Sequence, residues 1–237
     1  MTRRITTWNI KHGGGGTKGR QVPVAEQLLK FDADILVVTE FRPNASGAYI
    51  TDQLQQAGYS LTHPGGPEKA NSVLIGSRSP ITYAAPFDVD LEDHRHIWSA
   101  TTSGIRVCGI YMPMEKAKIP YWQSLFRDRE SDTAHDLYIG DFNTGNNEID
   151  LTDGATKYTC ADLFDDFHAG NTKELWRTFN PVAREYSWYS NHGNGFRLDH
   201  AFAKTSLQER VVTCRYEHEP RENRLSDHSA LTIELSE

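Results

Sequence analysis

The stretch Leu137-Tyr138-Ile139-Gly140-Asp141-Phe142-Asn143 joins an apolar, strand-like run to an acid and an amide. Three other apparent strands are bordered by polar side chains of the same kind, in Trp8-Asn9-Ile10, Val38-Thr39-Glu40 and Leu225-Ser226-Asp227-His228. The end of a strand can hold a polar side chain rigidly beside a cleft. Four such ends would gather oxygen ligands for a hard cation together with one imidazole. The sequence therefore predicts a site for metal-assisted phosphate chemistry.

The composition is that of one globular unit. The chain has 237 residues, of which 38% are hydrophobic, and that is enough to bury one sizeable core. No long polar or Pro-rich linker interrupts it, so we expect a single domain over residues 1–237. The chain has no apolar run long enough to predict a membrane span, and its amino-terminal residues lack the apolar core of a signal peptide. The three cysteines are odd in number and widely spaced, which favours a reduced, cytoplasmic protein without cysteine-bound zinc.

Charge is unevenly distributed along the chain. The net charge is −7, yet residues 1–30 hold six Lys or Arg residues and one acid, whereas residues 128–166 hold eleven acids. The net negative charge of the chain argues against tight nonspecific binding of nucleic acid, because the affinity of such binding comes mainly from Lys and Arg contacts to phosphates. A local basic edge beside an acidic site remains compatible with it. The alternative is that both regions are ordinary solvated faces.

Apolar runs alternate with turn signals at short intervals. Ser103-Gly104 predicts a hairpin turn between two of these runs. Early βαβ order followed by many strands predicts an α/β fold with two packed sheets flanked by helices. The predicted strands are 4–10, 34–39, 72–76, 96–102, 105–111, 136–140, 196–203, 210–216 and 229–235, and the predicted helices are 22–31, 47–57, 120–130 and 158–167.

Asp141 and Asn143 are the first candidates for chemistry. Alternation along a strand end puts both on one side and turns Phe142 towards the core. A carboxylate beside an amide suits the activation and orientation of a water that attacks phosphorus. The alternative is a plain turn, since Asp and Asn favour turns.

His228 is the candidate imidazole. It could donate a hydrogen bond to charge that develops on a phosphate, and a carboxylate could hold its tautomer. Asp227 and His228 are adjacent and face opposite ways, so a third residue should orient the ring. Asp199 is the candidate, because it too lies near the start of a strand. The alternative is a surface Asp-His pair.

Asn9 and Glu40 end the first two predicted strands. Ile35-Leu36-Val37-Val38 is typical of a fully buried parallel strand, so Glu40 should emerge where the core opens. A buried carboxylate needs a partner, and a divalent ion is one. The alternative partners are Arg42 and Arg3.

Gly14-x-Gly16-x-x-Gly19 formally matches the dinucleotide-binding fingerprint, with Glu40 about 20 residues further on. Lys11-His12-Gly13 separate the glycines from the strand, however, whereas the fingerprint requires a tight turn at the strand end. Arg20-Gln21 after Gly19 also excludes a Walker loop. We therefore expect a flexible glycine loop near the rim of the site.

Six of these segments together resemble the endonuclease/exonuclease/phosphatase family, the group that includes exonuclease III and DNase I. They occur in the family's order and span residues 7–228. The resemblance implies a four-layer α/β sandwich, DNase I-like, in which two packed mixed β-sheets are flanked by helices. The segments are Thr7-Trp8-Asn9-Ile10, Thr39-Glu40, Ile110-Tyr111-Met112-Pro113, Gly140-Asp141-Phe142-Asn143, Arg197-Leu198-Asp199 and Ser226-Asp227-His228.

Two features resemble the exonuclease III and abasic-site endonuclease branch. Tyr111 stands where other branches have histidine, and the aromatic segment that begins at Tyr186 resembles that of the branch. The resemblance implies that Trp188, Phe196 and Leu198 line a pocket for a sugar without its base; the alternative is aromatic core packing. The chain departs from the branch at Lys11, at Met114 and in the short segment 190–195.

The resemblance implies a monomeric Mg²⁺- or Mn²⁺-dependent phosphodiesterase that acts on DNA, with a role in DNA repair. Oxygen ligands without a Cys or multi-His set favour these ions over zinc. Glu40 would bind the metal with help from Asn9 and Asp227, while Lys11 and Arg20 would contact phosphates. Asp141 would act as the base, Asn143 would position the water, His228 held by Asp199 would stabilise charge, and Tyr111 would contact the phosphate.

Two rival functions remain open at this point. The first is hydrolysis of a small phosphodiester, a lipid headgroup or single-stranded nucleic acid by the same chemistry, which the acidic balance favours. The second is a noncatalytic binding module on the same fold.

Overall fold

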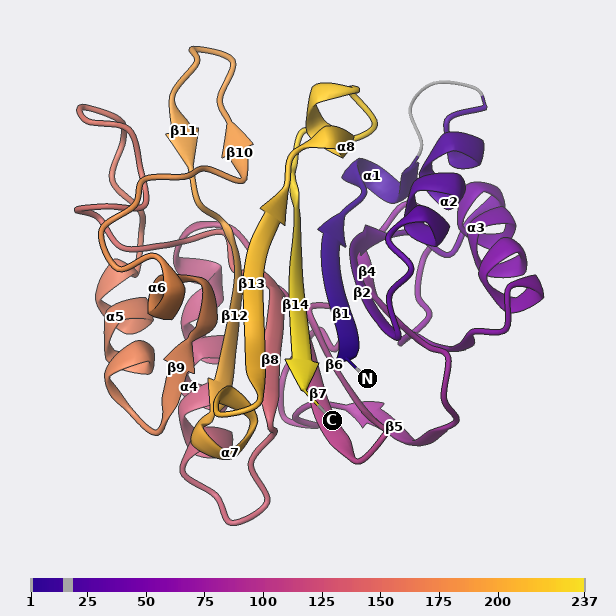
Figure 1. The fold of residues 1–237 in the computed structure, drawn as a ribbon, viewed down its shortest axis with the longest axis horizontal. Helices are drawn as coiled ribbons and strands as arrows, with labels where there is room; N and C mark the ends of the chain where they lie inside the picture. Colours follow the sequence, from indigo (N-terminus) through magenta and orange to yellow (C-terminus); the bar gives the residue numbers. More distant parts are fainter. Residues whose placement is uncertain (1, 15–18, 237) are drawn as a thin grey trace.

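The computed structural model describes residues 2–14 and 19–236. Two six-stranded sheets pack face to face, and helices cover the outer face of each, which gives four layers (Figure 1). The first sheet has the order β13 (Val211–Glu217), β14 (Ala230–Ser236), β1 (Thr2–Asn9), β2 (Ile35–Phe41), β4 (Ser72–Ser77) and β3 (Ser60–Thr62). The second has the order β5 (Ile81–Pro86), β6 (Ile97–Thr102), β7 (Ile105–Tyr111), β8 (Leu137–Asp141), β12 (Asp199–Lys204) and β9 (Thr172–Glu174).

Both sheets are mixed, because each contains one parallel pair in its middle. β1 runs parallel to β2, and β7 runs parallel to β8, while the other pairs are antiparallel. The carboxyl ends of both pairs lie at the same end of the sandwich, because Asn9 at the end of β1 contacts Asp141 at the end of β8. The short hairpin of β10 (Trp188–Tyr189) and β11 (Gly195–Phe196) lies at that end too (Figure 1).

Helices form the two outer layers. The longer ones begin where the sequence provides a start signal: Asn44 caps one through its side chain, and Pro120 occupies the first turn of another. The outer layer of the first sheet contains α2 (Gln21–Lys30) and α3 (Ala45–Gln56), and that of the second contains α4 (Ile119–Arg129) and α5 (Ala161–Ala169). The short elements are α1 (Lys11–Gly14), η1 (Glu115–Lys118), α6 (Leu175–Phe179), α7 (Thr205–Gln208) and α8 (Glu219–Glu222).

The core has three parts that follow from this layering. Alternating β-branched and aliphatic residues such as Val37, Val107 and Ile139 fill the space between the sheets. Leu28 and Leu54 from α2 and α3 belong to a second cluster on the outer side of the first sheet. A third, strongly aromatic cluster packs α4 and α5 against the second sheet, and it includes Trp122, Phe142 and Phe167. Phe142 thus points into the core, as the alternation around Asp141 predicted.

The sequence predictions for the main elements are confirmed to within three residues, with one exception. The turn at Ser103-Gly104 is also present, with positive φ at both residues. The exception is the predicted strand 196–203, which is broken: Phe196 pairs within the small hairpin, and β12 begins only at Asp199. Before Asp199 the backbone pairs instead with the segment around Asp150: Phe196 forms a bridge with Leu151, and the backbone N–H of Arg197 donates to the carbonyl oxygen of Asp150 at 2.8 Å.

The glycine-rich segment contains a tight turn at the rim of the site. Lys11, His12, Gly13 and Gly14 all have positive φ, so the chain reverses in a left-handed turn directly after β1. A Cβ at Gly13 would lie 2.8 Å from Arg42 Cβ, so a larger residue does not fit there. Gly16, which belongs to the predicted glycine loop, lies outside the described residues. None of the helices in residues 2–14 and 19–236 has the length and apolar character needed to cross a bilayer.

Candidate functional site

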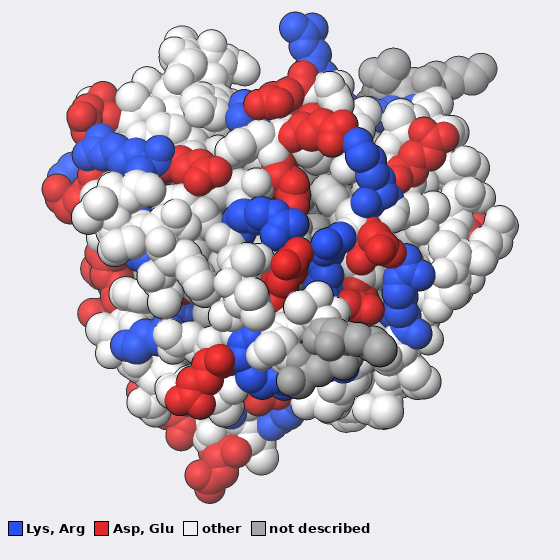
Figure 2. All heavy atoms as spheres, viewed as in Figure 1, with Lys and Arg blue, Asp and Glu red and all other residues white. Residues whose placement is uncertain are grey.

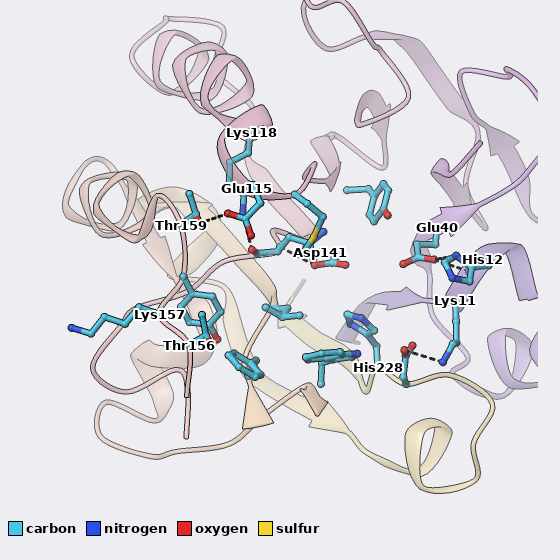
Figure 3. A pocket seen from close by; sticks show the side chains of 18 residues that line it. Lys11, His12, Glu40, Glu115, Lys118, Asp141, Thr156, Lys157, Thr159 and His228 are labelled. Carbon is cyan, nitrogen blue, oxygen red and sulfur yellow. Dashed lines mark hydrogen bonds and ion pairs between the residues drawn. The ribbon is translucent and has the colours of Figure 1, made fainter. Parts of the chain in front are cut away.

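A cavity of about 430 Å³ opens at the end of the sandwich where the parallel strands finish. We call it the main pocket, and Figure 3 shows its side chains. Ten of the thirteen predicted site residues line it: Lys11, Glu40, Tyr111, Asp141, Asn143, Trp188, Phe196, Leu198, Asp227 and His228. The other three lie nearby: Asn9 and Asp199 are buried directly beneath it, and Arg20 lines a neighbouring hollow.

Asp141 lies at the carboxyl end of β8 and is only 1% exposed. Its Oδ2 accepts a hydrogen bond from Asn9 Nδ2 at 2.9 Å, and its Oδ1 accepts one from the backbone N–H of Asn143 at 2.9 Å. Burial and the nearby carboxylate of Asp199 raise the pKa of Asp141 to about 7. A carboxylate with such a pKa is suited to accept a proton near neutral pH.

Asp199 and His228 form a buried pair beside Asp141. Asp199 is opposite Asp141 in the register of β12 and β8, and its Oδ2 lies 2.8 Å from His228 Nδ1. This is the contact that the sequence pattern predicted between Asp199 and the imidazole. Burial by itself would lower the pKa of His228, but the charge and hydrogen bond of Asp199 outweigh it and raise that pKa to about 10. The ring is therefore a cation that can donate from Nε2.

The backbone around this pair is fixed by other buried polar groups. Ser187 Oγ accepts hydrogen bonds from the backbone N–H groups of Leu198 and Asp199, at 3.0 and 3.3 Å. Trp8 Nε1 donates to the carbonyl oxygen of His228 at 3.1 Å, and Ser226 Oγ donates to the carbonyl oxygen of Asn9 at 2.6 Å. The Trp-Asn and Ser-Asp-His segments, more than 200 residues apart in sequence, thus hold each other in place.

Asn9 links the two carboxylates of Glu40 and Asp141. Its Nδ2 donates to Glu40 Oε1 at 3.1 Å as well as to Asp141, and its Oδ1 accepts from the backbone N–H of Lys11. Glu40 has a φ of 54° at a register shift in β2, which turns its side chain towards the pocket. Its Oε2 contacts the backbone N–H of His12 at 2.6 Å and His12 Nδ1 at 2.9 Å. Neither Arg42 nor Arg3, the alternative partners, pairs with Glu40 among the described residues.

Asp227 also lines the pocket and pairs with Lys11, whose Nζ lies 3.0 Å from Oδ2. Burial opposes ionisation of this acid, but the charge of His228 and the contact with Lys11 lower its pKa. Lys11, a position where the chain departs from the resemblance, therefore neutralises part of the acidic site. Figure 3 shows this contact on the side of the pocket nearest Glu40 and His12.

Tyr111 and Asn143 lie at the ends of β7 and β8. The hydroxyl of Tyr111 accepts a hydrogen bond from Asn71 Nδ2 at 3.1 Å, and burial together with the charge of Glu40 raises its pKa, so it stays protonated. Asn143 has a φ of 49°, and its Nδ2 donates to the carbonyl oxygen of Met112 at 2.7 Å. Both side chains are thus held by neighbours rather than free to rotate.

Sequence reasoning missed two parts of the pocket. Lys118 is 1% exposed, and its Nζ donates to the carbonyl oxygen of Asn143 at 2.6 Å, which supports the left-handed turn there. Burial lowers the pKa of Lys118. The segment 156–159 forms another wall, and Thr159 Oγ1 donates to Glu115 Oε2 at 2.6 Å (Figure 3). Only tertiary proximity places these residues at the site, so no local signal pointed to them.

An aromatic wall closes one side of the pocket. Trp188 and Phe196 are opposite each other in the small hairpin, with ring centres 5.6 Å apart, and Leu198 lies beside them. Trp188 and Phe196 are both part-exposed at the pocket, and the Trp188 ring lies 6.5 Å from that of His228. Tyr158, which the sequence did not single out, packs edge-on against Phe196. The wall faces the polar groups across the cavity.

The donor set fits a hard divalent cation. Asp141, Asp199 and His228 offer ligand atoms that all lie within 4.8 Å of one another, but Nδ1 of the ring already contacts Asp199. Glu40 is not in that group, yet its carboxylate shares the donor of Asn9 with Asp141. Asp199 Oδ1 is buried without a hydrogen-bond partner among residues 2–14 and 19–236. Carboxylate oxygens without a cysteine ligand suit Mg²⁺ or Mn²⁺.

Comparisons with known proteins agree with this fold. The model of the Endonuclease/Exonuclease/phosphatase family matches residues 6–228. The 3'-5' exonuclease NExo from Neisseria meningitidis has a TM-score of 0.85 and 25% identity over 99% of this chain and 100% of its own. The 3' phosphatase NExo from Neisseria, bound to a product DNA hairpin, gives 0.84 and 25% over the same shares.

A third solved structure supports the fold alone. The AP endonuclease from Archaeoglobus fulgidus has a TM-score of 0.82 and 22% identity, over 98% of each chain. No curated protein sequence matches the chain significantly.

Proposed function

Because the chain belongs to the endonuclease/exonuclease/phosphatase family, we propose that it is a divalent-metal-dependent phosphodiesterase and a DNA-repair-type nuclease. The family consists of nucleases and phosphatases that hydrolyse phosphate esters with a divalent metal ion. The observation that carries the proposal is the buried Asp199–His228 pair, which lies beside a carboxylate with a raised pKa in one pocket. A proton acceptor and a charged donor are thereby fixed around the space that a phosphate would occupy.

Glu40 would hold Mg²⁺ or Mn²⁺ at the pocket. Asn9 would orient the metal ligands, since its amide donates to both Glu40 and Asp141, and Asp227, which lines the same pocket, would complete the set. When bound, such an ion neutralises charge on the phosphate and assists in forming the attacking nucleophile. Its positive charge would also relieve the repulsion among the buried carboxylates.

The protein's own groups would carry the proton and the developing charge. Asp141 accepts the proton of the attacking water, while Asn143 positions that water. His228 donates a hydrogen bond from Nε2 to a phosphoryl oxygen, and Asp199 keeps the ring charged and oriented. The hydroxyl of Tyr111, which stays protonated, contacts the phosphate or assists the leaving group.

The substrate we propose is DNA, at an abasic site or at a 3' end. The aromatic wall of Trp188, Phe196 and Leu198 supports a pocket for a deoxyribose next to the scissile phosphate. Two of the similar structures are of a 3'-5' exonuclease and of a 3' phosphatase bound to a DNA hairpin. The three free cysteines support a reducing, cytoplasmic location. We also propose that the protein is a monomer.

A second candidate is hydrolysis of a small phosphodiester, a lipid headgroup or single-stranded nucleic acid. The net charge of −7 favours it, and acidic and basic side chains are interspersed on the face drawn in Figure 2, without a broad basic band. Proteins that bind duplex DNA gain most of their affinity from contacts between such basic bands and the phosphates.

One substrate panel separates the two candidates. The protein is assayed with Mg²⁺ on an abasic-site duplex, blunt and recessed duplexes, a single strand, and bis-p-nitrophenyl phosphate. Preference for the abasic or recessed duplex supports the DNA-repair nuclease. Turnover of the small diester without activity on any duplex supports the second candidate, and no hydrolysis of any substrate contradicts both.

A further inference from the structure

A second hollow opens beside the main pocket and shares part of its wall. Its volume is about 350 Å³, and Lys11 and Asp227 line both cavities. The rest of its lining comes from α8 and the loop after it, from β10 and from the residue before α2. Figure 1 shows that α1, α8 and β10 all lie at the end of the sandwich where the main pocket opens. The additional lining residues are Arg20, Tyr189, Arg221, Arg224 and Ser226.

Positive charge dominates this basic hollow. Four of its lining side chains are cationic and one is acidic, and that acid, Asp227, already pairs with Lys11. Within residues 2–14 and 19–236, the guanidinium groups of Arg20, Arg221 and Arg224 form no ion pair with a carboxylate. Glu222 of α8 is exposed and does not line the hollow. Three guanidinium groups without carboxylate partners at one concavity favour an anion there.

Two of the arginines are held in position before any ligand arrives. Arg20 donates through Nη2 to the carbonyl oxygen of Leu225 at 2.5 Å, while its Nε is buried without a hydrogen-bond partner in the described chain. Arg221 donates through Nε to Ser229 Oγ at 3.0 Å, and its guanidinium lies 4.6 Å from the centre of the Tyr189 ring. A preorganised guanidinium loses less side-chain entropy when it binds an anion.

We propose that the basic hollow is a second phosphate subsite, which binds a non-scissile phosphate of the nucleic-acid strand whose scissile phosphate lies in the main pocket. The inference rests on the proposed function, because the shared wall of Lys11 and Asp227 makes the two cavities neighbours along one strand. Guanidinium groups match phosphate oxygens in geometry and charge. A substrate that carries a second phosphate therefore gains affinity that a small diester cannot gain.

The test uses Arg224→Gln, because Arg224 is exposed and forms no ion pair with a carboxylate of the described residues. Arg224→Lys retains the charge, and Arg215→Gln on β13 removes the same charge from an exposed position that lines neither cavity. Binding of a fluorescent duplex oligonucleotide that contains an abasic site is measured by anisotropy in EDTA at several salt concentrations. We expect Arg224→Gln to weaken binding about tenfold and to reduce the slope of log K against log salt by about 0.9, the value for one phosphate contact to duplex DNA. Arg224→Lys and Arg215→Gln should bind within about twofold of the unmodified protein.

A second readout separates this inference from the proposed function. The same proteins are assayed with Mg²⁺ on the oligonucleotide and on bis-p-nitrophenyl phosphate, and the ratio of the two kcat/KM values should fall about tenfold in Arg224→Gln. If the unmodified protein hydrolyses both substrates and Arg224→Gln binds the oligonucleotide like Arg215→Gln, the subsite is overturned and the function stands. If binding depends on Arg224 but neither substrate is hydrolysed, the function is overturned and the subsite stands. An unmodified protein that binds no oligonucleotide contradicts the subsite.

Discussion

Asp141→Asn should make the metal-free protein more stable while it removes most of the activity. Burial and the Asp199 charge raise the pKa of Asp141 to about 7, against an ordinary value of 3.8. This difference corresponds to about 4 kcal/mol of unfolding free energy that the ionised carboxylate costs at pH 8. The amide avoids that cost, but its NH₂ group must face one of two donors, Asn9 Nδ2 or the Asn143 N–H, at a cost of about 1–3 kcal/mol. The expected net gain at pH 8 is therefore about 1–3 kcal/mol.

The pH dependence of this gain identifies its cause. The pKa of Asp141 is higher in the folded than in the unfolded protein. The stabilisation by protonated Asp141 is therefore fully present at pH values below its pKa in the unfolded protein, and it is lost as pH rises through about 7. The advantage of the variant should thus shrink by about 2–3 kcal/mol between pH 8 and pH 5. Urea unfolding in EDTA at both pH values measures it, with the exposed Asp132→Asn as the control.

The kcat of Asp141→Asn with Mg²⁺ should fall by roughly 10²–10⁴, the usual range for a positioned base. If Asp141→Asn is less stable than the unmodified protein by the same amount at pH 5 and pH 8, the claim that ionised Asp141 destabilises the metal-free protein is refuted. Near-normal kcat would refute the role as base.

Other predictions concern the imidazole, its partner and the aromatic wall. His228→Ala should lower kcat by roughly 10²–10⁴ on bis-p-nitrophenyl phosphate, and Asp199→Asn should lower it less, because the ring remains but loses its orientation and charge. If either variant keeps a normal kcat while Glu40→Ala is inactive, the role assigned to the residue changed in that variant is wrong. Trp188→Ala should reduce kcat/KM on an abasic duplex more than on an intact one, which comparison of the two duplexes measures directly. Equal losses of kcat/KM on the abasic and the intact duplex would indicate that Trp188 only packs against its neighbours. Activity on DNA should fall steeply with added salt if phosphate contacts supply the affinity, and a flat salt profile would argue against them.

The longer strands except β5, and many residues of the candidate site, follow from local patterns in the sequence. Strand ends are recognisable because an apolar run stops at a polar residue, and Asn9, Glu40 and Asp141 each stand at such a stop. Parallel pairing of β1 with β2 then places Asn9 beside Glu40, whereas the packing of the two sheets brings Asp141 to Asn9. The pairing of Asp199 with His228 also followed from the sequence, since adjacent strand residues face opposite ways and exclude Asp227.

The remaining features depend on contacts that no local pattern encodes. Lys118 reaches the site from η1 only because that segment packs beneath Asn143, and Arg221 and Arg224 reach the basic hollow from α8 and the loop that follows it. The short strands β3 and β9 have three residues each, too few for a period to be detected. The break before Asp199 accompanies backbone pairing of Phe196 and Arg197 with the segment around Asp150, to which Arg197 is also joined by a buried ion pair, and this tertiary contact overrides strand propensity.

The most direct test of the account is the metal dependence of phosphodiester hydrolysis. The protein is stripped with EDTA, and hydrolysis of bis-p-nitrophenyl phosphate is followed before and after addition of Mg²⁺ or Mn²⁺. Mn²⁺ binding is measured in parallel by electron paramagnetic resonance for the unmodified protein and Glu40→Gln. The account predicts no turnover in EDTA, recovery with either ion, and much weaker Mn²⁺ binding by Glu40→Gln, because oxygen ligands at this pocket hold the ion. Full turnover by the metal-free protein would contradict it.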